Sequence, residues 1–137
     1  MSVSWHGVYP ALTTKFTADD RLDFALFERN LKAQLAAGVN GVILGGTLGE
    51  ASVLNNVEKF DLVKFTVDKV AGQVPVVMNI AEGSTREAVK LAQEAGRCGA
   101  TGLMMLPPMR YKSDHRETVA YFKAVASETS LPMMVYN

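Results

Sequence analysis

Short apolar runs alternate with longer amphipathic segments along the chain, and this repeat restricts the possible folds more than any other feature. The apolar runs occupy residues 7–14, 41–46, 74–80, 102–107 and 131–136, and they begin roughly every 30 residues. Runs that are continuously apolar, rather than alternating, are typical of parallel strands buried on both faces. The repeat therefore predicts five parallel strands joined by four helices.

Each segment between two apolar runs has the spacing and the end signals of a helix. The first has Asp23 as a candidate N-cap and Gly38 as a candidate terminator. The other three begin with the capping-box spacing, at Asn55 and Glu58, Ser84 and Glu87, and Asp114 and Glu117. We expect one crossover helix after each of the first four strands.

Two α/β architectures fit this order of elements. A doubly wound sheet is one, but the sequence lacks the G-x-G-x-x-G turn after the first strand. The other is the (β/α)₈ TIM barrel, whose eight units take about 250 residues. We predict that residues 1–137 are the N-terminal part of one barrel domain, with strands 1–5. They would then belong to a protein of roughly 290 residues.

Composition excludes several classes of function. Of the 137 residues 48% are hydrophobic and 20% charged, and the formal net charge is +0, which argues against a nucleic-acid partner. Cys98 is the single cysteine, and the two histidines, His6 and His115, are far apart, so we expect no metal site. No leader pattern or run of about 18 apolar residues occurs, which predicts a cytoplasmic protein with no membrane partner.

The stretch GGTLGE, residues 45–50, follows the second apolar run, at the strand end where α/β proteins carry their function. It is not a phosphate-binding Walker loop, because no Gly-Lys follows. Two interpretations remain open. It is a tight strand-to-helix turn, or Gly45 and Gly46 let the backbone N–H groups near Thr47 and Leu48 reach a small carboxylate.

Four stretches together resemble the dihydrodipicolinate synthase / N-acetylneuraminate lyase family. They are GVYPALTTKF, GVILGGTLGEAS, STREAVKLAQEAGRCGATGLMMLPP and LPMMVYN, in family order along all 137 residues. The resemblance implies a lyase that joins a lysine to pyruvate or another 2-oxo acid, or to a cyclic imino acid, as an imine. It also implies a homo-oligomer, dimer or tetramer, and no cofactor.

The resemblance assigns roles to individual residues. Tyr136 would be the proton-transfer tyrosine, with the hydroxyl of Thr47 as its partner, and Gly46, Thr47 and Leu48 would bind the substrate carboxylate. The alternative for Tyr136 is an aromatic residue that only fills the barrel. The imine lysine of the family lies on strand 6, beyond this sequence.

Two positions depart from the family pattern. Leu48 replaces a second hydroxyl in the turn, and Arg110 stands where the synthases have the tyrosine of an inter-subunit relay or active-site mouth, with Tyr111 one residue later. The combination of GTLGE, LPPMRYK and the final Tyr-Asn resembles the branch that acts on 1-pyrroline-4-hydroxy-2-carboxylate, a deaminating hydro-lyase, which is therefore an alternative function.

An imine lysine must be desolvated to supply free amine. Lys15 and Lys112 fall in loops, and six further lysines fall on helices, where they should face solvent: Lys32, Lys59, Lys64, Lys69, Lys90 and Lys123. We therefore expect the 137 residues alone to be inactive. Three other interpretations stay open, namely a non-catalytic barrel that binds a 2-oxo acid, a half-barrel that pairs with a second chain, and, less favoured for want of ligands, a metal-dependent aldolase.

Overall fold

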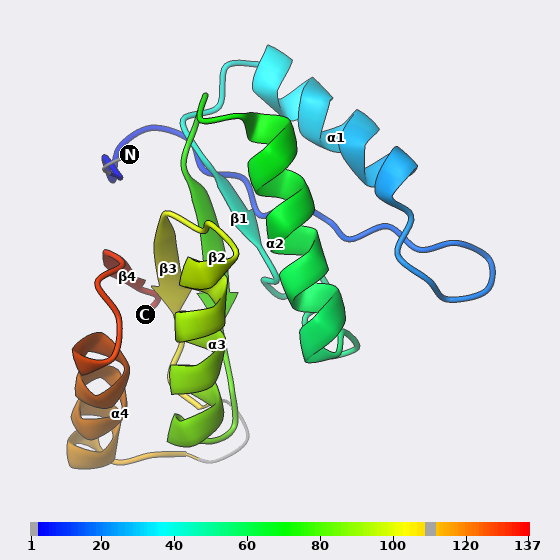
Figure 1. The fold of residues 1–137 in the computed structure, drawn as a ribbon. Coiled ribbons are helices and arrows are strands. Elements are labelled where there is room, and N and C mark those ends of the chain that lie inside the picture. The colour runs from blue at the N-terminus through cyan, green and yellow to red at the C-terminus, as the bar shows by residue number, and fades with distance from the viewer. Residues whose placement is uncertain (1–2, 109–111) are drawn as a thin grey trace.

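The computed structural model describes residues 3–108 and 112–137, in which helices and strands alternate (Figure 1). The elements follow in the order α1 (Phe24–Ala36), β1 (Val42–Leu44), α2 (Asn56–Val70), β2 (Val76–Ile80), α3 (Thr85–Arg97), β3 (Gly102–Met105), α4 (His115–Ser127) and β4 (Met133–Val135). The four helices and the last four strands predicted from the apolar repeat are therefore present.

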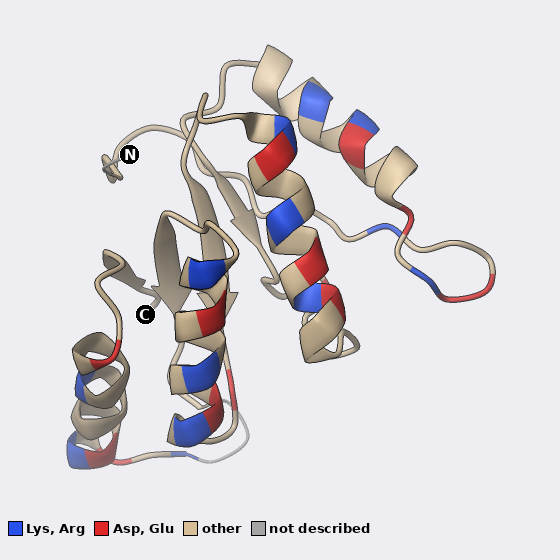
Figure 2. Ribbon diagram, in the orientation of Figure 1, with Lys and Arg blue, Asp and Glu red and all other residues tan. Residues whose placement is uncertain are grey.

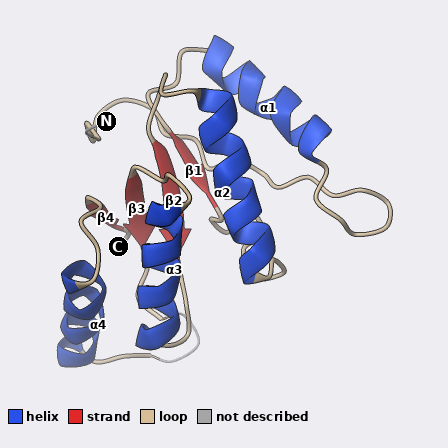
Figure 3. Cartoon of the chain, viewed as in Figure 1, coloured by secondary structure: helices blue, strands red, loops and turns tan. Residues whose placement is uncertain are grey.

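The four strands form one parallel sheet in the order β1-β2-β3-β4, so neighbours in sequence are neighbours in space. All four helices lie on the same side of this sheet (Figure 3). A doubly wound sheet reverses its strand order at a switch point and places helices on both faces. Uniform progression with one layer of helices is instead the arrangement of consecutive units in a barrel wall.

The predicted strand at residues 7–14 is wrong as a strand, although the segment does lie beside β1. Among the described residues it forms one parallel bridge, between Ala11 and Ile43, and the N–H of Asn40 also donates to the carbonyl of Val8. The N–H of Ile43 donates to the carbonyl of Pro10, and the N–H of Leu12 donates to the carbonyl of Ile43. Pro10 has no N–H of its own and so cannot extend the ladder, which limits the segment to a short edge contact.

The helix starts agree with the predicted caps. Complete capping boxes are present at Asn55 and at Asp114, where side chain and backbone bond reciprocally with the residue three positions on. Asp23 accepts a hydrogen bond from the N–H of Leu26. At Ser84 only half of the predicted box forms, because its hydroxyl accepts from the N–H of Glu87 with no reciprocal bond.

The two faces of the sheet carry different apolar clusters. The face toward the helices holds the larger core, which includes Leu44, Met78 and Leu103 together with the buried sides of the helices. The opposite face carries Ile43, Val77 and Met104 and is called the inner face below. In a closed barrel this face would point to the barrel interior, which is packed with side chains.

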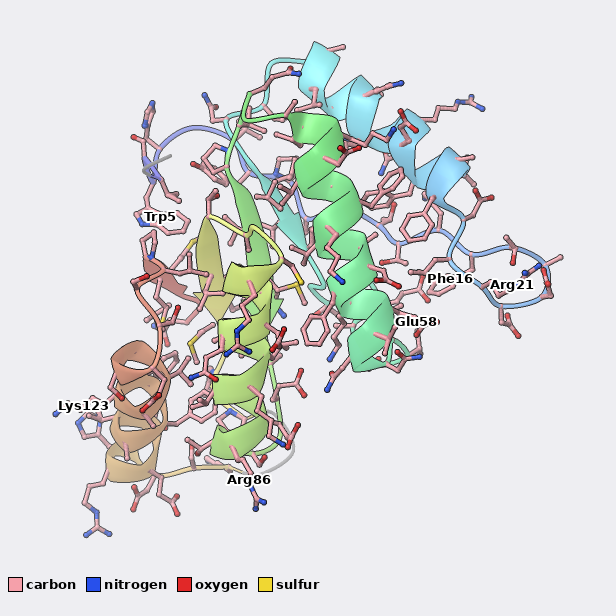
Figure 4. All side chains as sticks on the ribbon, viewed as in Figure 1. Trp5, Phe16, Arg21, Glu58, Arg86 and Lys123 are labelled. Atoms are coloured by element: carbon pink, nitrogen blue, oxygen red, sulfur yellow. The ribbon has the colours of Figure 1, made fainter. Side chains whose placement is uncertain are left out.

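Charged residues are concentrated on the helices and in the loop before α1 (Figure 2). Arg86 on α3 and Lys123 on α4 point away from the sheet (Figure 4). The solvent-facing position predicted for the helical lysines is confirmed for Lys32, Lys64, Lys90 and Lys123, and Lys69 is partly exposed. The prediction is wrong for Lys59, which is buried.

Candidate active site at the carboxyl ends of the strands

A cavity of about 500 Å³ opens at the carboxyl ends of β1 and β2. Its wall comes from three parts of the chain, namely the turn after β1, the start of α2 and the segment that follows β2. Leu106, directly after β3, completes it. Function in parallel α/β proteins is concentrated at this edge, because the loops that leave the strands there converge. The cavity is therefore the candidate active site.

The turn at residues 45–50 follows the carboxyl end of β1 and has a conformation that depends on glycine. Gly45 has φ +64°, and a Cβ added there would lie 2.8 Å from Cε of Met78. At Gly49 an added Cβ would lie 3.0 Å from the carbonyl oxygen of Leu12 and 3.2 Å from the backbone nitrogen of Gly45. Both positions need glycine, one for its left-handed backbone and the other for its close approach.

The turn leaves N–H groups without a protein acceptor. The N–H of Gly49 donates to the carbonyl of Gly46, and that of Glu50 to the carbonyl of Thr47. Within residues 3–108 and 112–137, the N–H groups of Thr47 and Leu48 donate to no protein atom. As at the start of a helix, these first N–H groups of a turn can receive an anion.

Two buried polar side chains hold the turn at its ends, and the sequence analysis missed both. Nδ2 of Asn79 donates to the carbonyl of Gly45 at 2.8 Å. The hydroxyl of Thr14 donates to the carbonyl of Gly49 at 2.6 Å. A signal for Asn79 was available, because it is the one polar residue in the apolar run at residues 74–80.

The structure places the predicted site residues in different surroundings. Gly46 and Thr47 line the cavity. Leu48 is 66% exposed and points its side chain to solvent. Tyr136 follows β4, its N–H donates to the carbonyl of Met105 at 2.8 Å, and it is 56% exposed. The cavity and Tyr136 thus share the carboxyl edge of the sheet, but Tyr136 does not line the cavity. Arg110 and Tyr111 lie outside the described residues.

Lys59 enters the cavity wall from the first turns of α2 and corrects the expectation that helical lysines face solvent. Its Nζ lies 2.8 Å from Oε1 of Glu82, which follows β2, and the two side chains are 8% and 23% exposed. A desolvated lysine thus does lie in this part of the chain, contrary to the sequence-based expectation. Its Nζ is engaged by the carboxylate of Glu82 and is therefore not presented to the cavity as a free nucleophile.

Tyr121 of α4 is buried beside the same carboxylate. Burial raises the pKa of Tyr121 to about 12, and the negative charge of Glu82 adds to this effect, with a smaller opposing contribution from the backbone of Glu82. The phenol therefore stays protonated at neutral pH. Glu82 is thus paired with Lys59 of α2 and also acts on Tyr121 of α4.

The described part of the chain contains no group of three histidine, cysteine, aspartate or glutamate residues that could hold a metal ion. In the same residues, no helix combines the length and the apolar character needed to cross a bilayer. The site is thus built from backbone amides, a hydroxyl and an ion pair.

Sequential parallel strands, one layer of helices and a cavity at the carboxyl edge define this chain as part of a (β/α)₈ barrel. The model of the Dihydrodipicolinate synthetase family matches residues 4–137, and the chain belongs to this family.

Individual relatives agree with this assignment. The chain is 38% identical over 131 residues to the 4-hydroxy-tetrahydrodipicolinate synthase of Exiguobacterium sibiricum, covering 96% of this chain and 45% of that protein. Its structure matches YagE, a prophage protein of the dihydrodipicolinic acid synthase family from E. coli K12 in complex with pyruvate. That match has a TM-score of 0.93 and 33% identity, over 97% of this chain and 45% of that one.

The N-acetylneuraminate lyase of Mycoplasma synoviae also matches, with a TM-score of 0.87 and 25% identity over 96% of this chain and 46% of that one. The resemblance inferred from the sequence is therefore confirmed at the level of family and fold. The chain spans less than half the length of these relatives, and it corresponds to the N-terminal part of their barrel.

Proposed function

We propose that the full-length protein is a lyase that forms a Schiff base with pyruvate or with another 2-oxo or cyclic imino acid. The observation that carries this proposal is the turn after β1, which presents the unpaired N–H groups of Thr47 and Leu48 at the carboxyl edge of the sheet. A carboxylate brought into a cavity needs several donors, because its unpaired burial is costly. The pyruvate bound to YagE supports the same class of ligand.

Within this proposal, the N–H groups of Thr47 and Leu48 bind the carboxylate, beside Gly46. Tyr136 transfers protons, and the hydroxyl of Thr47 serves as its partner. An unperturbed tyrosine has a pKa near 10, so it needs such a partner to exchange protons at neutral pH. Tyr136 follows β4 at the carboxyl edge of the sheet, beside the end of β3, and this position is compatible with the role.

The imine lysine is proposed to lie outside residues 1–137. Lys59 is the one buried lysine of the described residues, and its Nζ is engaged in an ion pair with Glu82. In the reaction, a free amine attacks the 2-oxo carbon, the C–N bond forms, and the carbonyl oxygen leaves as water. The resulting imine withdraws electrons from the neighbouring carbon.

The test is borohydride trapping in the full-length protein encoded by the gene, read by intact mass and peptide mapping. We expect an irreversible adduct with pyruvate on a lysine beyond residue 137. An adduct with 1-pyrroline-4-hydroxy-2-carboxylate and none with pyruvate would identify the deaminating hydro-lyase instead. Ligand binding without any adduct would indicate the non-catalytic binding barrel, and an adduct on Lys59 would overturn the site proposed here.

The proposed role of Tyr136 is tested by Tyr136→Phe, with Tyr9→Phe as a matched control. Tyr9 lies at the other end of the inner face, where its hydroxyl donates to the carbonyl of Ser4. Loss of a positioned proton-transfer group lowers kcat by about 10²–10⁴-fold. We expect this loss for Tyr136→Phe alone, and near-normal turnover would return Tyr136 to a packing role.

We further propose that the full-length protein is a cytoplasmic homo-oligomer, a dimer or a tetramer. The family resemblance supports this statement. Light scattering coupled to size-exclusion chromatography measures it directly, and a monomer at working concentration would contradict it.

A further inference from the structure

Asn79 is an anomaly in the buried strand β2. It is 4% exposed, and every other residue of Val76–Ile80 is apolar and buried. A side-chain amide offers two donor hydrogens and an acceptor oxygen, so its burial is favourable only where these groups find partners. At Asn79 the amide nitrogen has a partner, but the oxygen has none among the described residues.

The orientation of the Asn79 amide is determined by its one partner. Its Nδ2 lies 2.8 Å from the carbonyl oxygen of Gly45. Only a donor can face an acceptor at that distance, so the amide nitrogen must lie on that side and Oδ1 on the other. Oδ1 is buried and, within residues 3–108 and 112–137, has no hydrogen-bond partner.

An unpaired buried oxygen destabilises the folded state, and a leucine of similar size would not carry it. A leucine would in turn leave the carbonyl of Gly45 without a donor, so stability alone does not select asparagine at position 79. What the asparagine supplies and a leucine lacks is the hydrogen bond to Gly45, the residue at which the chain turns with φ +64°.

We propose that Asn79 is a positioning residue for the carboxylate-binding turn. The peptide between Gly45 and Gly46 is planar, so holding its carbonyl oxygen also fixes the direction of the N–H of Gly46 and the course of the chain into Thr47. The hydroxyl of Thr14 holds the carbonyl of Gly49 at the other end. Between these two bonds lie the N–H groups of Thr47 and Leu48.

This inference rests on the proposed function, because the turn is taken to bind the substrate carboxylate. Asn79 lines the same cavity, and in this proposal its amide lies behind the turn and is bonded to the carbonyl of Gly45. It acts through the backbone of the turn, so its removal should weaken ligand binding while the fold is retained.

The test uses Asn79→Leu in the full-length protein. This change removes the unpaired Oδ1 but leaves the carbonyl of Gly45 without a donor, so one unpaired oxygen replaces another. We expect a urea midpoint equal to that of the wild type or higher. The Kd for pyruvate, measured by titration calorimetry, should rise about tenfold, because misplacing a binding group by a fraction of an ångström is enough for such a loss.

A second measurement needs no ligand. The N–H groups of Gly49 and Glu50 are protected by hydrogen bonds inside the turn. In Asn79→Leu their hydrogen exchange should accelerate about tenfold, with exchange in α3 unchanged. Thr14→Val is the matched comparison. It removes the hydrogen bond from Thr14 to the carbonyl of Gly49 at the other end of the turn. Because this change removes no unpaired atom in compensation, it should accelerate the same exchange and also lower the urea midpoint.

The outcomes separate this inference from the proposed function. If the wild type does not bind pyruvate but exchange in the turn accelerates in Asn79→Leu, the positioning role stands and the assigned ligand is wrong. Unchanged exchange with an unchanged Kd in Asn79→Leu would overturn the positioning role alone. A urea midpoint that falls as far as in Thr14→Val, with faster exchange throughout β2, would show that Asn79 only supports the fold.

Discussion

Breaking the buried ion pair between Lys59 and Glu82 should cost more when the carboxylate is removed than when the ammonium is removed. The two charges lie 2.8 Å apart, which corresponds to an attraction of about 6 kcal/mol at an effective dielectric constant of about 20. Desolvation of both groups offsets much of this attraction. The net effect of a substitution therefore depends on what happens to the partner that stays behind.

The exposed fractions of the two side chains determine which single variant loses more stability. Glu82→Gln leaves the Lys59 ammonium, whose side chain is 8% exposed, without a counter-charge, and we expect a loss of about 3 kcal/mol in the free energy of unfolding. Lys59→Met leaves Glu82, at 23% exposed, where water can reach it. Methionine also retains the apolar stem of the lysine. This variant should lose about 1–2 kcal/mol.

The assay is equilibrium urea unfolding of the full-length protein with both single variants and the double variant. The double variant should lose less than the sum of the single losses, by about 1 kcal/mol or more. Lys64→Met is the control, because Lys64 pairs with Asp61 at 3.8 Å with both side chains largely exposed. It should change stability by less than about 0.5 kcal/mol. Additive losses, or the reverse order of the single variants, would refute the reasoning.

Three other predictions concern stability. In the unfolded chain Tyr121 ionises near pH 10, whereas in the fold its pKa is raised to about 12. The free energy of unfolding should therefore fall by about 1.4 kcal/mol per pH unit between about pH 10 and about pH 12. Urea unfolding at about pH 9 and about pH 11 should detect this fall, and Tyr121→Phe should remove it. Gly45→Ala should lower the free energy of unfolding by about 1–2 kcal/mol in the same assay, because Gly45 has φ +64° and Cε of Met78 lies close to the new methyl group. Gly83→Ala is the control, because the space around its new methyl group is open, and it should change the free energy of unfolding by less than about 0.5 kcal/mol. Asn55→Ala should lose about 1 kcal/mol with the α2 capping box and Asn55→Asp very little, and an equal loss in both would contradict the capping role.

Local signals in the sequence predicted most of the architecture. The apolar repeat located four strands and four helices, because burial on both faces removes polar residues from a parallel strand whatever the distant context. Caps at Asn55 and Asp114 formed as expected, since a capping box needs only residues three positions apart. The strand expected at residues 7–14 failed because Pro10 lacks the N–H that a longer ladder requires.

Some features of the candidate site follow from the sequence, and others only from the tertiary structure. The sequence by itself located the glycine turn at residues 45–50 and identified the family, because glycine spacing and collinear motifs are properties of the chain alone. Only the tertiary structure showed that Asn79 and Thr14 hold this turn and that Lys59 lies buried against Glu82. These partners are 34, 35 and 23 residues apart. Pairing across such distances depends on strand register and helix packing. The sequence alone therefore cannot distinguish a buried, ion-paired lysine on a helix from an exposed one.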